Sequence, residues 1–221
     1  MGNQGIAVVT GGGKGIGAAI CQRLAADGYR ILLTYHNSSQ AAEKVVERIC
    51  NDGGDAFAVR VDCSDPAEVY VLADHPWIRT VTGGPVEVLV INHGRYDRMA
   101  TDELTTEHLQ RTMDTNFTGA FHVWKALAPH LTGNARIVVV GSQLGIRGSP
   151  HGGDYSASKA AFTHGQEALH KRLDPRVSAS TSLPQVTSIL RFWKMIALRG
   201  GHCEKAKSPY VVSAPPKTWP E

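Results

Sequence analysis

Short apolar runs alternate along the chain with longer segments whose apolar positions recur every three or four residues. The runs are nearly continuous in Val, Ile and Leu, as expected for strands of a parallel sheet that is buried on both faces. They cover Ile6–Thr10, Ile31–Tyr35, Phe57–Val61, Val86–Ile91 and Ile137–Val140.

The intervening segments have the helical period, which is clearest where Leu109, Met113, Phe117 and Phe121 follow one another. Strand–helix alternation predicts βαβ units with right-handed crossovers. The expected fold class is therefore α/β, a Rossmann-like doubly wound parallel sheet in three α/β/α layers. We expect helices over Gly15–Asp27, Ser38–Asn51, Pro66–Thr80, Thr105–Leu131 and Asp154–Leu173.

The alternation stops after Val177. Ser178–Ser182 is polar where a sixth strand is due, and four prolines punctuate the end of the chain. We therefore expect one α/β domain over residues 1–177 and an irregular tail over 178–221, which would leave the C-terminal part of the fold incomplete. The prolines are Pro209, Pro215, Pro216 and Pro220.

Composition narrows the class of protein. The chain has 221 residues, 42% of them hydrophobic and 19% charged, and a formal charge of +3, which is too small to indicate a nucleic-acid partner. No apolar run approaches the ~18–20 residues of a membrane span, and the first ten residues lack the basic and long apolar regions expected of a signal peptide. No C-x-x-C pair occurs, so we expect neither a metal site nor a disulfide framework, and we place the protein in the cytoplasm. The cysteines are Cys21, Cys50, Cys63 and Cys203.

A glycine-rich loop follows the first expected strand and opens the first helix. Its sequence is Thr10-Gly-Gly-Gly-Lys-Gly-Ile-Gly17. Glycines let a backbone approach a phosphate, and the helix offers free N–H groups and the positive end of its dipole. Glycine clusters also mark ordinary turns, but the strand–loop–helix context favours a dinucleotide site.

Tyr155 and Lys159 are spaced to lie on one face of the last expected helix, one turn apart. A phenol is a poor acid or base near neutrality, and a neighbouring ammonium would lower its pKa. Ser142 follows the Ile137–Val140 strand, at the sheet edge where doubly wound folds bind ligands. Taken singly, each of these residues could equally be a surface or turn residue.

Taken together and in order, these motifs resemble the short-chain dehydrogenase/reductase family over about residues 5–177. The glycine spacing Thr-Gly-x-x-x-Gly-x-Gly is that of the family, although Ile91 and His93 stand where the family has Asn and Ala. The resemblance implies a catalytic set of Asn116, Ser142, Tyr155 and Lys159, with Asn116 holding a water that relays protons to Lys159. The cofactor contacts that it implies are Gly11, Lys14, Gly15, Ile16, Gly17, Asn37, Ser38, Asp62, Cys63, Asn92, Gly94, Tyr155 and Lys159.

The end of the second expected strand indicates which nicotinamide cofactor would bind. Thr34–Ser39 contains no carboxylate to hold a ribose 2′-hydroxyl, whereas Lys14, Asn37 and Ser38 suit a 2′-phosphate. We therefore expect NADP(H). The alternative is that Lys14 is only a solvated loop residue.

The resemblance implies reduction of a ketone, on a small or acyl-carrier-bound substrate. Within the family, Thr34–Glu43 and Gly13–Gly17 look most like 3-oxoacyl-acyl-carrier-protein reductases. The alternative is a catalytically inactive dinucleotide-binding or dimerisation partner. The helices carrying Asn116 and Tyr155 often pair two subunits in this family, so their apolar faces could form a homo-oligomer interface or belong to the core.

The tail departs from the family pattern at one point. The nine residues Ser178–Val186 can be back-translated so that a reading frame begun two bases later gives Arg-Val-Asn-Val-Ile-Ala-Pro-Gly, which is the family's next strand. Such a back-translation is free to choose among synonymous codons. Our hypothesis is that residues 178–221 are translated out of frame, which would leave a less stable and weakly active or inactive protein; the alternative is a divergent extension.

Overall fold

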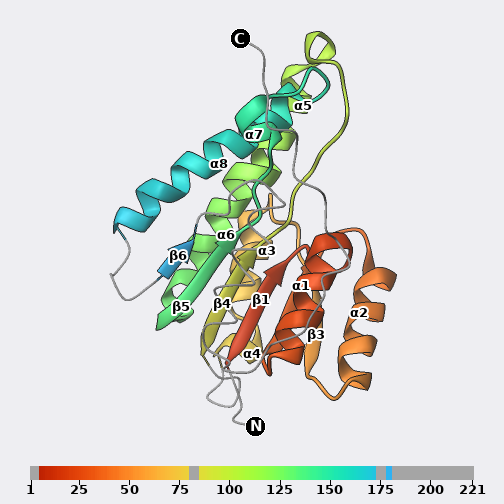
Figure 1. Ribbon diagram of the computed structural model, residues 1–221, viewed down its shortest axis with the longest axis vertical. Coiled ribbons are helices and arrows are strands. Elements are labelled where there is room, and N and C mark those ends of the chain that lie inside the picture. The colour runs from red at the N-terminus through yellow and green to blue at the C-terminus, as the bar shows by residue number, and fades with distance from the viewer. Residues whose placement is uncertain (1–4, 80–84, 173–177, 181–221) are drawn as a thin grey trace, which may run out of the picture.

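The computed structural model describes residues 5–79, 85–172 and 178–180. Strands of this part form one parallel sheet in the order β3-β2-β1-β4-β5-β6 (Figure 1). The sheet confirms the expected Rossmann-like, doubly wound fold. The strands are β1 (Ile6–Thr10), β2 (Arg30–Tyr35), β3 (Ala56–Arg60), β4 (Val86–Ile91), β5 (Leu131–Val139) and β6 (Ser178–Ser180).

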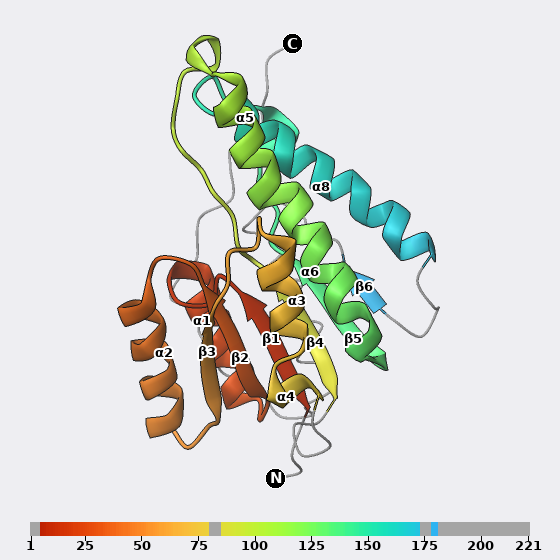
Figure 2. The same ribbon diagram turned by 180° about the vertical axis from the view of Figure 1, so that it is seen from behind.

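Helices cover both faces of the sheet. The α1 and α2 helices pack on one face of the sheet through their buried residues Ile20, Leu24 and Ile49. The α3 and α6 helices cover the other face, which Figure 2 shows from behind. The α8 helix lies alongside α5 and the turn over Asp114–Thr118 on this second side, where Phe162 joins the core. The helices are α1 (Gly15–Ala26), α2 (Ser39–Asn51), α3 (Pro66–Ala73), α4 (Pro76–Arg79), α5 (Thr106–Met113), α6 (Gly119–Leu127), α7 (Leu144–Arg147) and α8 (Gly153–Arg172).

The order of the strands creates a crevice at the carboxyl end of β1. From β1 the chain builds β2 and β3 in one direction, and β4, β5 and β6 follow in the other. Loops that leave β1 and β4 therefore diverge, and the gap between them is where doubly wound sheets bind ligands.

Two of the expected helices are interrupted. The expected Pro66–Thr80 helix is wrong as one element, because α3 ends at Ala73 and Pro76 starts the separate α4; Thr80 lies outside the described residues. His75 Nδ1 accepts a hydrogen bond from the Trp77 backbone N–H in the gap between them. Proline has no N–H and suits the first turn of a new helix rather than the interior of an old one.

The expected Thr105–Leu131 helix is also not continuous. A π-turn over Asp114–Thr118 separates α5 from α6, a 3₁₀ turn covers Ala128–His130, and Leu131 already begins β5. Turns of this kind interrupt helices most often at functional sites.

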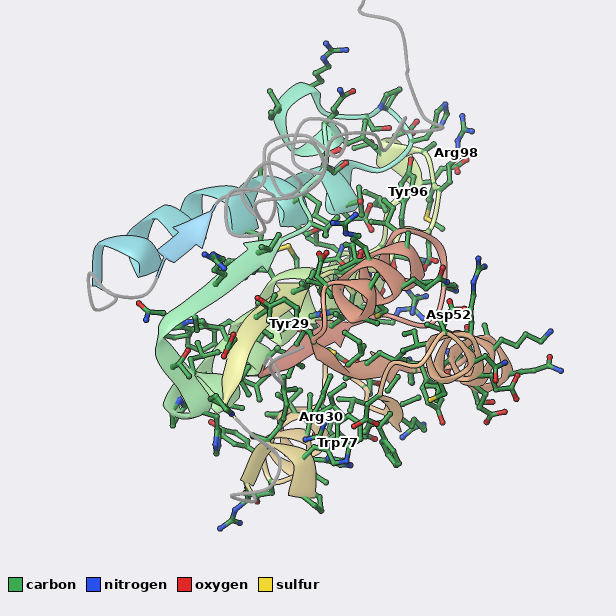
Figure 3. The ribbon with its side chains drawn as sticks, turned by 60° about the horizontal axis from the view of Figure 1, so that its bottom comes forward. Tyr29, Arg30, Asp52, Trp77, Tyr96 and Arg98 are labelled. Atoms are coloured by element: carbon green, nitrogen blue, oxygen red, sulfur yellow. The ribbon has the colours of Figure 1, made fainter. Side chains whose placement is uncertain are left out.

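The outermost strand differs from the prediction that both faces of each strand are buried. Phe57 of β3 is 45% exposed, because β3 has a strand on only one side. At the amino end of the neighbouring β2, the Arg30 guanidinium lies 4.2 Å from the centre of the Trp77 ring. Figure 3 shows this pair well away from Tyr96, which lies near the opposite end of the sheet.

The predicted tail lies largely outside the described residues. Only Ser178–Ser180 is described, as β6 beside β5, so the irregularity predicted for the rest of 178–221 stays a prediction. None of the helices in the described ranges is both long and apolar enough to cross a membrane.

Candidate active site

The glycine loop has the geometry of a phosphate cradle. Gly11 has a φ of +63° and Gly15 one of +53°, a backbone conformation that side chains disfavour. A Cβ on Gly17 would lie 2.3 Å from the Gly11 carbonyl oxygen, so only glycine fits there. The α1 helix begins at Gly15, and its exposed N-cap residue, Lys14, lies at the mouth of the loop.

A cleft of about 920 Å³ runs from this loop to Tyr155. It brings together most of the residues that the sequence predicted for the cofactor, from the loops that follow β1, β2, β3 and β4 and from α8. Gly15, Asn116 and Ser142 are not among its lining residues. The predicted residues that line it are Gly11, Lys14, Ile16, Gly17, Asn37, Ser38, Asp62, Cys63, Asn92, Gly94, Tyr155 and Lys159.

Asn92 ties the two diverging loops together. Its side-chain amide donates hydrogen bonds to the carbonyls of Thr10 and Gly11, at 3.1 and 2.9 Å. Its backbone N–H donates to the Thr10 hydroxyl at 3.0 Å. Asn92 therefore holds the start of the glycine loop in shape from the end of β4.

Asp62 lies at the end of β3, where the resemblance places the contact with adenine. Its Oδ1 accepts hydrogen bonds from the Ser64 backbone and hydroxyl, at 2.9 and 2.6 Å. Burial alone would raise the pKa of Asp62, but these bonds and the nearby His36 and Arg60 outweigh it and hold the pKa below its usual value. The carboxylate is thus charged and oriented at neutral pH.

Cys63 follows Asp62 and is buried. Burial, followed by the charge of Asp62, raises the pKa of its thiol to about 12. Cys63 is therefore a neutral side chain in the cleft wall and not a nucleophile.

Tyr155 and Ser142 meet at the far end of the cleft. A hydrogen bond joins their hydroxyls and lowers the pKa of Tyr155, but burial raises it by more, and the neighbouring Tyr96 adds to the increase. The expected net lowering of the Tyr155 pKa is therefore wrong for the protein without cofactor, in which this pKa is raised. The Lys159 ammonium lies 5.9 Å from the centre of the Tyr155 ring. At that distance burial of the phenol decides the direction.

Lys159 is 5% exposed, and its ammonium donates to the Val140 carbonyl at 3.1 Å. Burial lowers its pKa from 10.5 to about 8. A Cβ on Gly94 would lie 3.4 Å from this ammonium, so the missing side chain at Gly94 keeps space open beside it. The space and the three ammonium protons suit a ribose with two hydroxyls.

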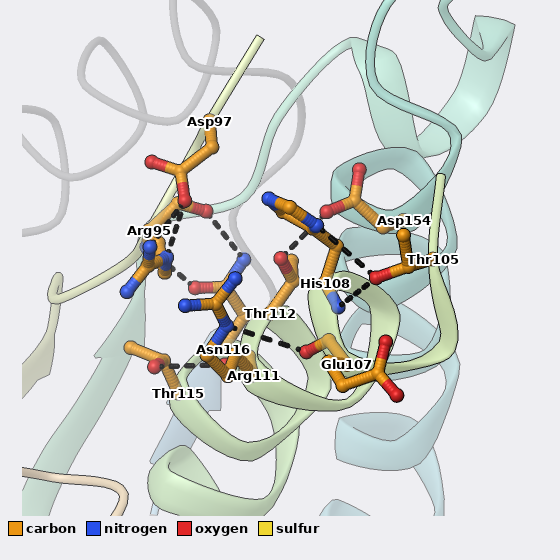
Figure 4. A network of polar contacts seen from close by, with 10 residues as sticks. All are labelled: Arg95, Asp97, Thr105, Glu107, His108, Arg111, Thr112, Thr115, Asn116 and Asp154. Carbon is orange, nitrogen blue, oxygen red and sulfur yellow. Dashed lines mark hydrogen bonds and ion pairs between the residues drawn. The ribbon is translucent and has the colours of Figure 1, made fainter. Parts of the chain in front are cut away.

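Asn116 lies in the π-turn and is 2% exposed (Figure 4). Its Oδ1 accepts from the Arg95 backbone N–H at 2.7 Å, and its amide donates to the Arg95 carbonyl and to the Ser158 hydroxyl, both at 2.9 Å. The side chain therefore fixes the loop after β4 against α8. Its predicted water relay stays a prediction. Both N–H groups of the side-chain amide are already used, so a water would have to bind Oδ1 or a backbone atom.

Further residues that the sequence analysis did not select also line the cleft, among them His36, His93 and Tyr96. His36 Nε2 lies 3.5 Å from Asp62 Oδ2, and His93 Nδ1 lies 2.7 Å from the Thr10 hydroxyl. Their positions in the sequence could have identified them. His36 directly precedes the predicted Asn37, and His93 and Tyr96 lie within two residues of the predicted Gly94.

The fold and this cleft define the class of protein, a dinucleotide-binding α/β protein whose cleft reaches the expected catalytic residues Tyr155 and Lys159. The family model described as short chain dehydrogenase matches residues 5–189. The chain belongs to this family, as its motifs indicated.

Two curated proteins and one solved structure are similar to this chain. An uncharacterised oxidoreductase of Methylorubrum extorquens is 36% identical over 171 residues, which are 77% of this chain and 68% of that protein. A probable tetrahydroxynaphthalene reductase of Zymoseptoria tritici is 34% identical over 158 residues, 71% of this chain and 58% of the relative. This chain thus spans less than two thirds of several curated relatives.

A solved structure, a short chain dehydrogenase of Burkholderia cenocepacia in complex with NADP, has a TM-score of 0.73 and 36% identity. The match covers 79% of this chain and 71% of that one. Its cofactor agrees with the prediction of NADP(H) from the end of β2.

Proposed function

We propose that the chain is an NADPH-dependent reductase of ketones. The observation that carries the proposal is the single cleft that runs from the glycine loop to Tyr155 and Lys159, with Ser142 hydrogen-bonded to Tyr155. A phosphate cradle and a proton donor at opposite ends of one cleft are what hydride transfer to a carbonyl requires.

The cleft fits NADP(H) along its length. The glycine loop would hold the pyrophosphate, Asp62 the adenine, and Lys159 the nicotinamide ribose. Lys14, Asn37 and Ser38 would hold the 2′-phosphate, because no carboxylate follows β2 to repel it. When bound, the reduced cofactor supplies the hydride.

The chain's own residues would handle the proton and the orientation of the substrate. The Ser142 hydroxyl donates to the carbonyl oxygen and fixes its position, and Tyr155 delivers its proton to the same oxygen. A raised phenol pKa keeps Tyr155 protonated before the reaction, which suits a proton donor in the direction of reduction. Lys159, close to the phenol, would favour the phenolate that is left.

Two classes of ketone are candidates. The resemblance of the second strand and the glycine loop favours a 3-oxoacyl thioester, whereas the similarity to a tetrahydroxynaphthalene reductase favours an aromatic ketone. The cytoplasm remains the proposed location, consistent with the free cysteines Cys21, Cys50 and Cys63 of the described part.

The test is NADPH oxidation by the purified full chain with an acetoacetyl thioester and with a bicyclic aryl ketone. We expect turnover of at least one, and we expect Tyr155→Phe to keep NADPH binding while turnover falls about 10²–10⁴-fold, because only the proton donor is lost. A Tyr155→Phe variant with nearly full activity would refute the assignment.

NADPH binding without turnover of either ketone would instead support the alternative, a catalytically inactive dinucleotide-binding or dimerisation partner. For that alternative, Phe121 on α6 is an exposed aromatic residue, 40% accessible, whereas Phe162 of α8 is already in the core. Light scattering of wild type and Phe121→Glu measures whether this helix face holds two copies together.

The proposal of an out-of-frame tail has its own test. Sequencing the coding DNA around codons 175–180 shows whether another frame continues into Arg-Val-Asn-x-x-x-Pro-Gly and beyond. Without such a frame, the residues after Val177 are a divergent extension.

A further inference from the structure

One aromatic residue beside the proton donor has been given no contact with the substrate so far. The ring of Tyr96 stacks on the ring of Tyr155, with centroids 4.5 Å apart and planes tilted by 33°. Tyr96 lines the cleft and remains 44% exposed, whereas Tyr155 is 8% exposed. One side of the Tyr96 ring thus covers Tyr155, and much of the remaining ring surface is open.

Three contacts fix the ring in this place. Its hydroxyl donates to the His151 carbonyl at 3.1 Å. A Cβ on Gly152 would lie 2.6 Å from Tyr96 Cε2, so the ring rests directly on the backbone before α8. The preceding residue, Arg95, has both its backbone N–H and its carbonyl bonded to buried Asn116.

This anchoring also gives the buried Asn116 amide a role. The amide holds the backbone from which Tyr96 projects, and Ser158 of α8 holds the amide. The Tyr96 ring and the Tyr155 hydroxyl are therefore kept in register by the same helix. A rigid side chain loses little entropy when a ligand binds against it.

From this geometry we propose that Tyr96 is a specificity-determining residue, an aromatic wall that selects flat, conjugated ketones over saturated ones of the same size. The inference rests on the proposed ketone reductase function and names its substrate class. A ketone whose oxygen reaches the Tyr155 hydroxyl lies next to the open part of the Tyr96 ring. An aromatic ring there gains a stacking contact that a saturated ring of equal size does not.

The test compares two ketones with one carbon skeleton, 1-tetralone and 1-decalone, through the ratio of their kcat/KM values. The proteins are wild type, Tyr96→Leu, Tyr96→Phe and a control, Tyr70→Leu, which removes a similarly exposed tyrosine from α3. Intrinsic reactivity of the two ketones cancels when their ratio is compared between variants.

We expect the tetralone preference to fall roughly three- to tenfold in Tyr96→Leu, in line with the strength of one aromatic contact. Tyr96→Phe should keep it, since the ring remains, and Tyr70→Leu should match wild type. An unchanged ratio in Tyr96→Leu overturns the inference while leaving the reductase function intact.

A binding measurement distinguishes failure of the reductase proposal from failure of the proposed role of Tyr96. If wild type reduces neither ketone, the reductase proposal fails for these substrates, and calorimetry on the NADPH-loaded protein then compares 1,2,3,4-tetrahydro-1-naphthol with decahydro-1-naphthol. A three- to tenfold loss of selectivity for the aromatic alcohol in Tyr96→Leu still supports the wall. No selectivity in wild type, or no binding of either alcohol, overturns it.

Discussion

Lys159 provides a quantitative test of how the active site affects the stability of the fold. Its ammonium is buried, and its pKa falls from 10.5 to about 8 in the folded protein. Between these two values the unfolded chain binds a proton that the folded chain does not, so the free energy of unfolding rises with pH. Below pH 8 both states are protonated, and the folded state carries the whole penalty of the buried charge.

The size of the effect follows from the shift. At roughly 1.4 kcal/mol per pKa unit, the full penalty is about 3 kcal/mol, and about 2–3 kcal/mol of it is relieved between pH 7 and pH 10. Replacing Lys159 with Met removes the titrating group and keeps most of the volume. The lost hydrogen bond to the Val140 carbonyl adds a cost of about 1–3 kcal/mol, which does not vary with pH.

The assay is urea unfolding of wild type, Lys159→Met and an exposed control, Lys44→Met, at pH 7 and pH 10. The raised pKa values of the buried thiols Cys21 and Cys63 act in the opposite direction, because these thiols ionise more readily in the unfolded chain. Their contribution is common to all three proteins and cancels in the differences.

We expect the stability of wild type relative to Lys159→Met to increase by about 2–3 kcal/mol from pH 7 to pH 10. Lys44→Met should follow wild type, since its side chain is exposed. A difference between wild type and Lys159→Met that is the same at both pH values would show that Lys159 carries no burial penalty, and the reasoning would fail.

Three further outcomes can be measured with the same protein. Lys14→Glu should weaken NADPH binding at least tenfold more than NADH binding, because a carboxylate repels the 2′-phosphate; equal weakening would mean that Lys14 does not contact it. Gly17→Ala should weaken both cofactors alike in fluorescence titrations, since its Cβ meets the Gly11 carbonyl at 2.3 Å, and unimpaired binding would contradict the cradle. At pH 8 only about one Cys63 thiol in 10⁴ is ionised, so peptide mapping after iodoacetamide treatment should find exposed Cys50 labelled at least a hundred times faster; comparable rates would contradict the burial of Cys63.

The sequence was a good guide wherever a residue's role depends on its near neighbours. β1 and β4 have the bounds that their apolar runs indicate, and the glycine loop lies between β1 and α1 as its spacing requires. Periodicity could not locate the break at Asp114–Thr118, because the apolar positions Met113 and Phe117 keep the helical spacing across it.

The sequence by itself determined the fold class and most of the expected cofactor residues in the cleft, since strand–helix alternation dictates a doubly wound sheet whose strand ends gather at one edge. Only the tertiary structure decided the protonation states of those residues. The pKa of Tyr155 is raised rather than lowered, because burial and Tyr96 outweigh the hydrogen bond from Ser142. Burial and a partner distant in the chain, such as Arg95 for Asn116, arise only when the chain is packed, so no local pattern carries them.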